Sequence, residues 1–381
     1  MHNRVLFVDD DPKILAALRR QLRKKVEIET VTSGRDGLDT IRREGPFSVV
    51  VTDYCMPEMN GIEFLTEVRK MAPETVRMLL TGSADLNAAI QAVNQGNIYR
   101  FLTKPCSSDA LLDALKTGMQ EYRHSHKERK FNRRTRRLLA QAKDIQQGLM
   151  PDEAPGIEGL DIAGRSIYCD QTGGDYYDYF EKHTADGRRV VVVVGDVSDH
   201  GLPSALLMTS ARAFLRESSK RRGSVSAVVG SVNQQLTRDV QTSGRFMTLF
   251  YAEIDRGARA IRWVRAGHEP AFLCDPASGQ VEEMGGRGGL PLGVFEEAGY
   301  EECSRQLDAG QVIAIGTDGI WEARNADGRM FGKQALQSML REHRDRPAVE
   351  ILTVILDALR RFVFPLEIQD DATLVIVKME G

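Results

Sequence analysis

Residues 190–196 of this chain read VVVVVGD. An unbroken run of β-branched residues that stops at Gly and Asp is typical of a buried strand with a functional loop at its end. The same pattern recurs where the run 312–315 is followed by Asp318, and where Asp370 precedes the run 373–377. Strands in the C-terminal half are therefore expected to begin or end at carboxylates.

These carboxylates suggest a chemistry. Asp175, within the stretch GGDYYD, adds to Asp196, Asp318 and Asp370. Carboxylates gathered at one place repel one another unless a cation neutralises them. Ligation by oxygen alone selects hard divalent ions, Mg²⁺ or Mn²⁺, over zinc. The pattern predicts a metal-dependent site for phosphoryl transfer.

Length and composition predict a globular protein of two domains. The chain has 381 residues, 42% of them hydrophobic and 28% charged, and its net charge of −3 argues against a general nucleic-acid binder. Five scattered cysteines without a CxxC pair suit a reducing compartment and exclude a cysteine-based zinc module. We see no signal-peptide pattern before Arg4 and no apolar run near the ~20 residues that span a bilayer, so we expect a cytoplasmic protein without a membrane partner.

The N-terminal third alternates short apolar runs with helical stretches. Runs lie at 5–8, 49–51, 78–80 and 99–102, and this alternation predicts an α/β domain with a doubly wound parallel sheet. In such a sheet the functional crevice lies at the C-terminal ends of the strands. The polar residues expected there are Asp9, Asp10, Asp53, Thr81 and Lys104.

These five side chains suit one reaction. Asp9, Asp10 and Asp53 can hold one Mg²⁺, and Asp53 is central enough to be the nucleophile. Lys104 and the Thr81 hydroxyl would then contact the phosphoryl oxygens on a modified Asp53. A single Asp at a strand end is more often a helix cap, so the interpretation depends on all five occurring in this order.

Residues 1–122 resemble the receiver domain of response regulators, a flavodoxin-like fold with a five-stranded parallel sheet. The matching motifs are VDD at 8–10, DYCMPEMNG at 53–61, LTG at 80–82 and LTKP at 102–105. The resemblance implies that a cognate histidine kinase phosphorylates Asp53 and that Thr81 and Phe101 form the switch pair, with Tyr99 as a rival for the aromatic position. The implied Mg²⁺ ligands are Asp9, Asp10, Asp53 and the backbone carbonyl of Cys55.

The segment 108–149 contains no proline and predicts one long linker helix. A helix of ~40 residues spans roughly 60 Å, which no single domain requires. An apolar stripe favours a parallel coiled coil, so we expect a homodimer through the linker, residues 123–155. Alternatively, the helix breaks near Arg123 and its second half packs on the following domain. The basic residues here are interpreted as a solvated face and not as a nucleic-acid site. The stripe consists of Leu138, Ala142, Ile145 and Leu149.

Residues 156–381 resemble the bacterial branch of the metal-dependent PP2C-type serine/threonine phosphatases, in particular those of sporulation and stress-response partner-switching systems. The motifs are GGDYYD at 173–178, GDVSDHG at 195–201, AGHEP at 266–270, LPLG at 290–293, GTDG at 316–319 and DDAT at 370–373. The resemblance implies an α+β fold, a β-sandwich flanked by helices, that binds two Mg²⁺ or Mn²⁺ ions. The implied metal ligands are Asp175, Asp196, Asp318, Asp370 and the backbone carbonyl of Val197.

Several neighbouring positions leave alternatives. Asp371 could replace Asp370, but adjacent side chains on a strand point to opposite faces, so only one of the two should enter the site. His200 is a candidate proton donor to the leaving alkoxide, whereas His268 is interpreted as structural. Asp199 stands where these phosphatases commonly carry Gly, and it could recruit a further metal or strain the loop.

Together these features predict a two-component response regulator that dephosphorylates phosphoserine or phosphothreonine on a partner protein. The resemblance implies that the partner is a phosphorylated anti-sigma-factor antagonist and that phosphorylation of Asp53 controls the activity. We expect a metal-activated water to attack the phosphomonoester in line, without a protein nucleophile. The alternative is a non-catalytic adaptor of the same architecture that binds a sigma factor or its regulator. The four filled acidic positions favour the enzyme.

Overall fold

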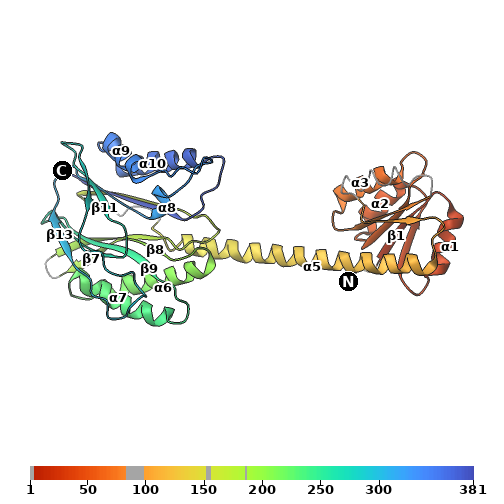
Figure 1. Cartoon of the computed structure of the whole chain (residues 1–381), viewed down its shortest axis with the longest axis horizontal. Helices are drawn as coiled ribbons and strands as arrows, with labels where there is room; N and C mark the ends of the chain where they lie inside the picture. The colour runs from red at the N-terminus through yellow and green to blue at the C-terminus, as the bar shows by residue number, and fades with distance from the viewer. Residues whose placement is uncertain (1–3, 83–97, 152–155, 185–186) are drawn as a thin grey trace. The chain divides into compact units, whose positions relative to one another are not determined.

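The computed structural model describes residues 4–82, 98–151, 156–184 and 187–381 (Figure 1). The chain forms two compact units, Met1–Arg136 and Arg137–Gly381. The division falls within helix α5 (Ser108–Gln147). No helix of the described ranges is both long and apolar enough to cross a lipid bilayer.

A five-stranded parallel sheet forms the N-terminal unit and confirms the predicted receiver fold. Its strands and helices are β1 (Arg4–Val8), α1 (Pro12–Leu22), β2 (Glu27–Val31), α2 (Gly34–Glu44), β3 (Val49–Asp53), α3 (Gly61–Met71), β4 (Val76–Thr81) and β5 (Arg100–Thr103). The strand order is β2-β1-β3-β4-β5. Phe7 and Val49 pack with α1 and α5, whereas Leu6 and Val50 pack with α2 and α3. Because helices cover both faces, the central strands are apolar without interruption.

The parallel register brings the C-terminal ends of the strands to one edge. Val8 lies opposite Thr52, and Asp53 lies opposite Leu80. The backbone N–H of Lys104 donates to the carbonyl of Thr81. The residues that follow β1, β3, β4 and β5 are therefore neighbours, as the doubly wound topology requires.

Helix α5 is continuous through Arg123, where the alternative interpretation placed a break. Leu111, Leu115 and Met119 pack into the core of the receiver. Near the other end of the helix, Gln146 is buried within the C-terminal unit. The predicted long linker helix is thus present.

Two five-stranded antiparallel sheets form the C-terminal unit and confirm the predicted sandwich. The first has the order β13-β10-β9-β8-β7, built from β7 (Tyr176–Thr184), β8 (Gly187–Val197), β9 (Met247–Asp255), β10 (Ala260–Ala266) and β13 (Cys303–Gln306). The second has the order β12-β11-β14-β15-β6, built from β6 (Leu160–Ile167), β11 (Ala271–Cys274), β12 (Val281–Met284), β14 (Val312–Gly316) and β15 (Ala372–Met379).

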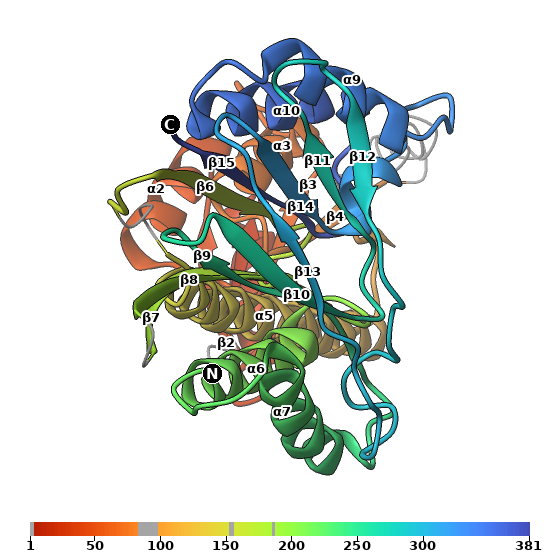
Figure 2. The ribbon, with the colours of Figure 1, turned by 90° about the vertical axis from the view of Figure 1, so that its left-hand side faces the viewer.

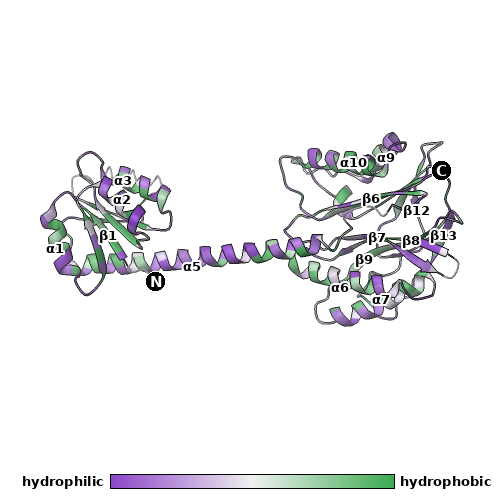
Figure 3. Ribbon diagram, turned by 180° about the vertical axis from the view of Figure 1, so that it is seen from behind, coloured by the Kyte–Doolittle hydropathy of each residue, from purple (hydrophilic) through white to green (hydrophobic). Residues whose placement is uncertain are grey.

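Helices cover the outer faces of both sheets (Figure 2). The first sheet carries α6 (Leu202–Ser218) and α7 (Val225–Val240), and the second carries α9 (Lys333–His343) and α10 (Ala348–Val363). Figure 3 shows polar and apolar residues alternating along α6, α7 and α10, as expected for helices with one buried face. The short helix α8 (Asp318–Trp321) follows β14 directly.

The valine run at 190–194 is buried on both faces of β8. Its five side chains share one core with Met208 and Leu215 of α6, and with Ile313 and Val375 of the opposite sheet. A strand sandwiched between a helix and a second sheet has no solvent face, so polar residues do not alternate along it. The run ends at Gly195; Asp196 is half-buried, and Val197 at the end of β8 still belongs to this core.

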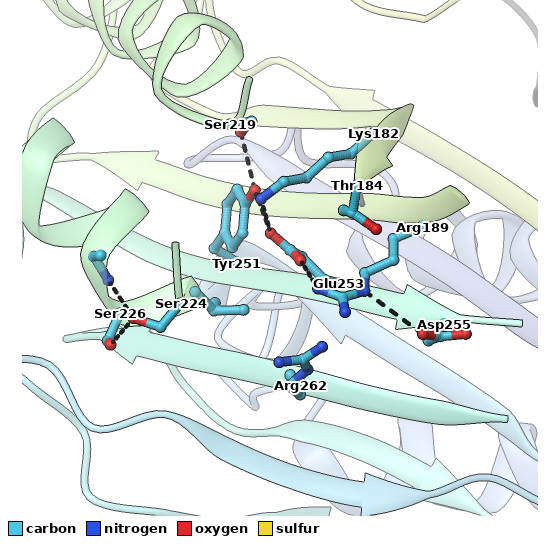
Figure 4. Close-up of polar contacts among 12 residues, drawn as sticks. Lys182, Thr184, Arg189, Ser219, Ser224, Ser226, Tyr251, Glu253, Asp255 and Arg262 are labelled. Atoms are coloured by element: carbon cyan, nitrogen blue, oxygen red, sulfur yellow. Dashed lines mark hydrogen bonds and ion pairs between the residues drawn. The ribbon is translucent and has the colours of Figure 1, made fainter. Parts of the chain in front are cut away.

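A buried ion-pair cluster joins β7, β8 and β9 (Figure 4). The Lys182 Nζ lies 2.6 Å from Glu253 Oε1, and the Arg189 Nη1 lies 3.3 Å from Glu253 Oε2. The Tyr251 hydroxyl donates to the same carboxylate and lies 2.9 Å from the Ser219 hydroxyl. Both oxygens of Glu253 are thus paired, which compensates the burial of its charge.

Candidate functional site

In the receiver, Lys104 joins two of the predicted site residues. Its Nζ lies 2.8 Å from Asp9 Oδ2 and 2.5 Å from Asp53 Oδ1. Burial lowers the pKa of Lys104, but hydrogen bonds to Asp53 and Asp9 outweigh it, and the net pKa is raised. Asp9 and Asp53 are buried, whereas Asp10 is exposed. The structure therefore brings Asp9, Asp53 and Lys104 together and leaves Asp10 open to solvent.

The other predicted receiver residues flank Asp53. The backbone N–H of Cys55 donates to Asp53 Oδ2 at 3.2 Å. The Thr81 side chain is fully buried, and its hydroxyl donates to the carbonyl of the next residue. Phe101 is half-buried against the core between the sheet and α2 and α3, whereas Tyr99 is exposed. The phosphoacceptor, Mg²⁺ and switch roles stay predictions.

In the C-terminal unit, four strand ends supply the predicted acidic residues. Asp175 immediately precedes β7, and Asp196 lies near the end of β8. Asp318 begins α8 just after β14, and Asp370 lies two residues before β15. Because β7 pairs with β8, and β14 pairs with β15, each sheet contributes two carboxylates.

The hydroxyl of Thr317 connects the two sheets at this point. It donates to Asp175 Oδ2 at 2.8 Å and accepts from the backbone N–H of Thr373 at 2.9 Å. All three residues are buried. A side chain from the end of β14 and the backbone of β15 therefore fix the carboxylate that precedes β7.

The carboxylates raise one another's pKa values. Burial, followed by the charges of Asp318, Asp370 and Asp371, raises the pKa of Asp196 to about 8. Burial, followed by the charges of Asp196 and Asp371, raises the pKa of Asp175 well above its usual range. Burial and the charge of Asp370 also raise the pKa of Asp318. A divalent cation would relieve this mutual destabilisation.

Other details of the site suit a bound cation. The buried Oδ1 of Asp175 has no hydrogen-bond partner, so it remains available to a ligand. A Cβ at Gly174 would come within 2.7 Å of the Val197 carbonyl oxygen, so these two loops approach closely because residue 174 is Gly. Across the described ranges, no three His, Cys, Asp or Glu side chains already form a metal-binding group. Metal binding stays a prediction.

The neighbouring acids Asp370 and Asp371 differ in their surroundings. Asp371 is buried and accepts hydrogen bonds from the backbone N–H groups of Cys169, Gly174 and Asp175, at 2.9, 2.7 and 3.5 Å. Asp370 is exposed. The carboxylate of Asp371 therefore organises the loop that carries Asp175, and Asp370 is the member of the pair that is open to a ligand.

Asp178 belongs to a different group of side chains. Its two oxygens accept from Arg216 Nη2 and Nε, each at 2.7 Å, and one of them also accepts from the Tyr176 hydroxyl at 2.7 Å. Its side chain is completely buried. This carboxylate thus pairs β7 with α6 and is already neutralised by an arginine.

The two histidines near the motifs also differ. His268 is buried, its Nδ1 lies 2.8 Å from the Thr248 hydroxyl, and its Nε2 lies 3.1 Å from the Gly316 carbonyl. Since a carbonyl only accepts, Nε2 carries the proton, and burial lowers the pKa to about 4. His200 is exposed, and its Nδ1 lies 3.2 Å from Asp170 Oδ2. Asp170 was not among the predicted site residues.

Gln146 is a site neighbour that sequence patterns did not reveal. Its Nε2 donates to the Gly173 carbonyl at 2.6 Å, and its Oε1 accepts from the Gly173 N–H at 3.1 Å. Gly173 lies two residues before Asp175. The segment was recognised by its apolar stripe, and a lone polar residue beside such a stripe gives no signal of its own.

Known families match both units. Residues 186–380 match the family model of Stage II sporulation protein E (SpoIIE), and residues 5–116 match that of the response regulator receiver domain. The chain is 27% identical over 237 residues to the phosphoserine phosphatase RsbU of Bacillus subtilis, which covers 62% of this chain and 68% of RsbU. It is 37% identical over 116 residues to the hydrogenase transcriptional regulatory protein HoxA of Cupriavidus necator, which covers 30% of this chain. The chain spans 24% of the length of HoxA.

Solved structures lead to the same conclusion for the C-terminal unit. The SiaA-PP2C domain of Pseudomonas aeruginosa superimposes with a TM-score of 0.56 and 26% identity, covering 65% of this chain and 98% of that domain. The SpoIIE match extends over more than half of the chain. The chain therefore belongs to the Stage II sporulation protein E (SpoIIE) family and combines a response regulator receiver domain with a PP2C-type phosphatase domain.

Proposed function

We propose that this chain is a two-component response regulator whose output is metal-dependent dephosphorylation of phosphoserine or phosphothreonine on a partner protein. The observation that carries the proposal is the position of Asp175, Asp196, Asp318 and Asp370 at four strand ends of two sheets that the Thr317 hydroxyl connects, with Asp175 Oδ1 buried and without a hydrogen-bond partner. Ionised carboxylates this close are costly unless a cation neutralises them. A structural role alone does not explain why four strand ends deliver them to one place.

The proposed ions would be held by side chains that the fold already fixes. When bound, Mg²⁺ or Mn²⁺ lowers the pKa of a water molecule and neutralises charge on the transferred phosphoryl group. Thr317 holds the carboxylate of Asp175, and Asp371 holds the loop before it. His200, whose Nδ1 lies beside Asp170, is the proposed proton donor to the leaving alkoxide. The residues proposed to hold two ions are Asp175, Asp196, Asp318, Asp370 and the backbone carbonyl of Val197.

A phosphorylated protein is the proposed substrate. The relative RsbU is named a phosphoserine phosphatase. In the partner-switching systems that the C-terminal motifs resemble, the substrate is a phosphorylated anti-sigma-factor antagonist, and we propose a substrate of that class here. Such a pathway would change transcription without contact between this chain and DNA.

Phosphorylation of Asp53 by a histidine kinase is the proposed control. Lys104 already bridges Asp9 and Asp53, so its ammonium group can follow a phosphoryl oxygen on Asp53. The proposed Mg²⁺ ligands are the carboxylates of Asp9, Asp10 and Asp53 with the carbonyl of Cys55. Thr81 and Phe101 are proposed to move in response, which would pass the signal on to α5.

The linker supports a homodimer. Phe131, Leu138 and Ile145 of α5 have exposed fractions of 69%, 56% and 70%. Their spacing of seven residues matches a heptad repeat, in which apolar residues line one face of a helix. Exposed large side chains at this spacing are explained by a second copy of the same helix.

The direct test is turnover of p-nitrophenyl phosphate by the full chain with Mn²⁺, before and after treatment with a small phosphodonor. Manganese-dependent turnover that changes after treatment supports the proposal. The rival function is a non-catalytic adaptor that binds a sigma factor or its regulator. Such an adaptor would bind its partner without turnover in any of these conditions.

A further inference from the structure

The loop that follows Asp196 is paired with the chain just before β9. Val197 lies opposite Met247 in the antiparallel register. Beyond that pair, the N–H of Ser198 donates to the Phe246 carbonyl at 2.9 Å, and the N–H of Phe246 donates to the Ser198 hydroxyl at 3.1 Å. The next residues along this register are Asp199 and Arg245.

Asp199 and Arg245 form an ion pair at this position. Their nearest atoms, Oδ2 and Nη2, are 3.6 Å apart, and the side chains are 71% and 29% exposed. Asp199 has a φ of 65°, in the left-handed region that Gly, Asn and Asp adopt most readily. An Asp can therefore replace the Gly that is common at this position. Its carboxylate pairs with Arg245.

The guanidinium group of Arg245 has unused donors. Its Nε is buried without a hydrogen-bond partner, and no side-chain hydrogen bond from Arg245 occurs among the described residues. Arg189, Arg265 and Arg305 also bury an unpartnered Nε, but each donates other guanidinium N–H groups. Arg212 buries an unpartnered Nε too, but this atom lies 4.0 Å from Asp178, a carboxylate that is already paired with Arg216. An arginine held beside a loop by one loose ion pair is therefore free to bind an anion.

We propose that Arg245 binds the phosphoryl group of the substrate and that Asp199 is the positioning residue that holds its guanidinium at the acidic site. This inference rests on the proposed phosphatase function. The acidic cluster by itself repels an anionic substrate, and Arg245 supplies a positive charge beside the loop that follows Asp196. Guanidinium groups match two phosphoryl oxygens at once, which a lysine cannot do.

The test uses the full chain with Mn²⁺ and inorganic phosphate as the probe. Arg245→Gln should raise both the KM for p-nitrophenyl phosphate and the inhibition constant of phosphate about tenfold, because the variant loses a charged hydrogen bond to the phosphoryl group. Arg245→Lys should have a KM and a phosphate inhibition constant between those of Arg245→Gln and the wild type. Asp199→Asn keeps the left-handed backbone and should raise KM about threefold, with kcat nearly unchanged.

Arg238→Gln is the matched control, because Arg238, on helix α7, pairs with Glu296 and not with a residue of the loop that follows Asp196. Manganese affinity, measured by calorimetry, should stay within about twofold in all variants. The inference is overturned if Arg245→Gln and Arg245→Lys both leave the phosphate constant unchanged, or if Arg245→Gln weakens manganese and phosphate binding equally. If the wild type shows no turnover, the proposed function fails, and calorimetric titration of phosphate in the presence of Mn²⁺ still decides the role of Arg245.

Discussion

The Gln146 side chain binds both the N–H and the carbonyl of Gly173, at 3.1 and 2.6 Å. This one amide at the end of α5 therefore satisfies both backbone polar groups of a residue just before Asp175. Both groups are buried, so no water replaces the amide if it is lost. The last turn of the linker helix and the first acidic loop of the phosphatase unit are thus joined by a specific contact.

Gln146→Met should lower the free energy of unfolding of the C-terminal unit by about 2–4 kcal/mol, because two buried backbone groups lose their partners while the side-chain volume is kept. Urea denaturation followed by tryptophan fluorescence measures the change. Gln235→Met is the control, since among the described residues the Gln235 side chain bonds only to Ser231 of its own helix, at 3.3 and 3.4 Å. Equal stability of the two variants would contradict the role assigned to Gln146.

Asp318→Asn should reduce manganese-dependent phosphatase activity by about a hundredfold or more, because the amide cannot supply the negative charge of a metal ligand. The measurement is the initial rate with p-nitrophenyl phosphate at saturating Mn²⁺. Asp357→Asn makes the same chemical change at an exposed residue that pairs with Arg360 on α10, and it should keep the wild-type rate. Retained turnover in Asp318→Asn would refute the proposed site.

The pKa of Asp196 predicts how stability changes with pH when divalent ions are removed by a chelator. Its folded pKa of about 8 lies above the unfolded value of about 3.9. Between these two values the folded state holds a proton that the unfolded state has released, so stability falls as pH rises from about 4 to about 8. Asp196→Asn should flatten this slope in urea denaturation at about pH 5 and about pH 7.5. An unchanged slope would mean that Asp196 is not protonated in the folded chain.

Runs of β-branched residues ending at Gly or Asp made most of the fold predictable. They located β8, β14 and β15, because strands buried on both faces leave an uninterrupted apolar signal. The sequence patterns did not locate strand β2, because it lies at the sheet edge and its residues are half-buried or exposed. They did not locate helix α9 either. Leu336 and Leu340 are its only fully buried residues, which is too few for a clear apolar face.

Only those residues of the candidate site that lie at strand ends could be predicted from the sequence. Each acidic residue follows or precedes an apolar run, so its position could be read from the chain. The roles of Thr317, Gln146 and Arg245 depend on contacts between segments distant in sequence. Such contacts follow from register and packing, which local patterns do not encode.

Leu138→Glu should weaken the proposed homodimer, because a charge on the apolar stripe of α5 would be buried against the second helix. Light scattering of the full chain at micromolar concentration should give a dimer mass for the wild type and a monomer mass for the variant. Gln147→Glu adds the same charge at an exposed position two residues after Ile145, on the other side of the helix, and should remain dimeric. A monomeric wild type would contradict the dimer.

Glu253→Gln should be the most destabilising of the changes considered, by about 3–5 kcal/mol, because it leaves Lys182 buried without a neutralising charge. The Lys182 and Glu253 side chains are only 5% and 1% exposed, and Arg189 keeps only its ion pair with Asp255, at 3.6 Å. Glu296→Gln breaks the exposed pair with Arg238 and should cost at most about 1 kcal/mol. Urea denaturation of both variants measures the difference. If both lose the same stability, water reaches the Glu253 cluster and compensates its charges, and the cluster is not part of the rigid core.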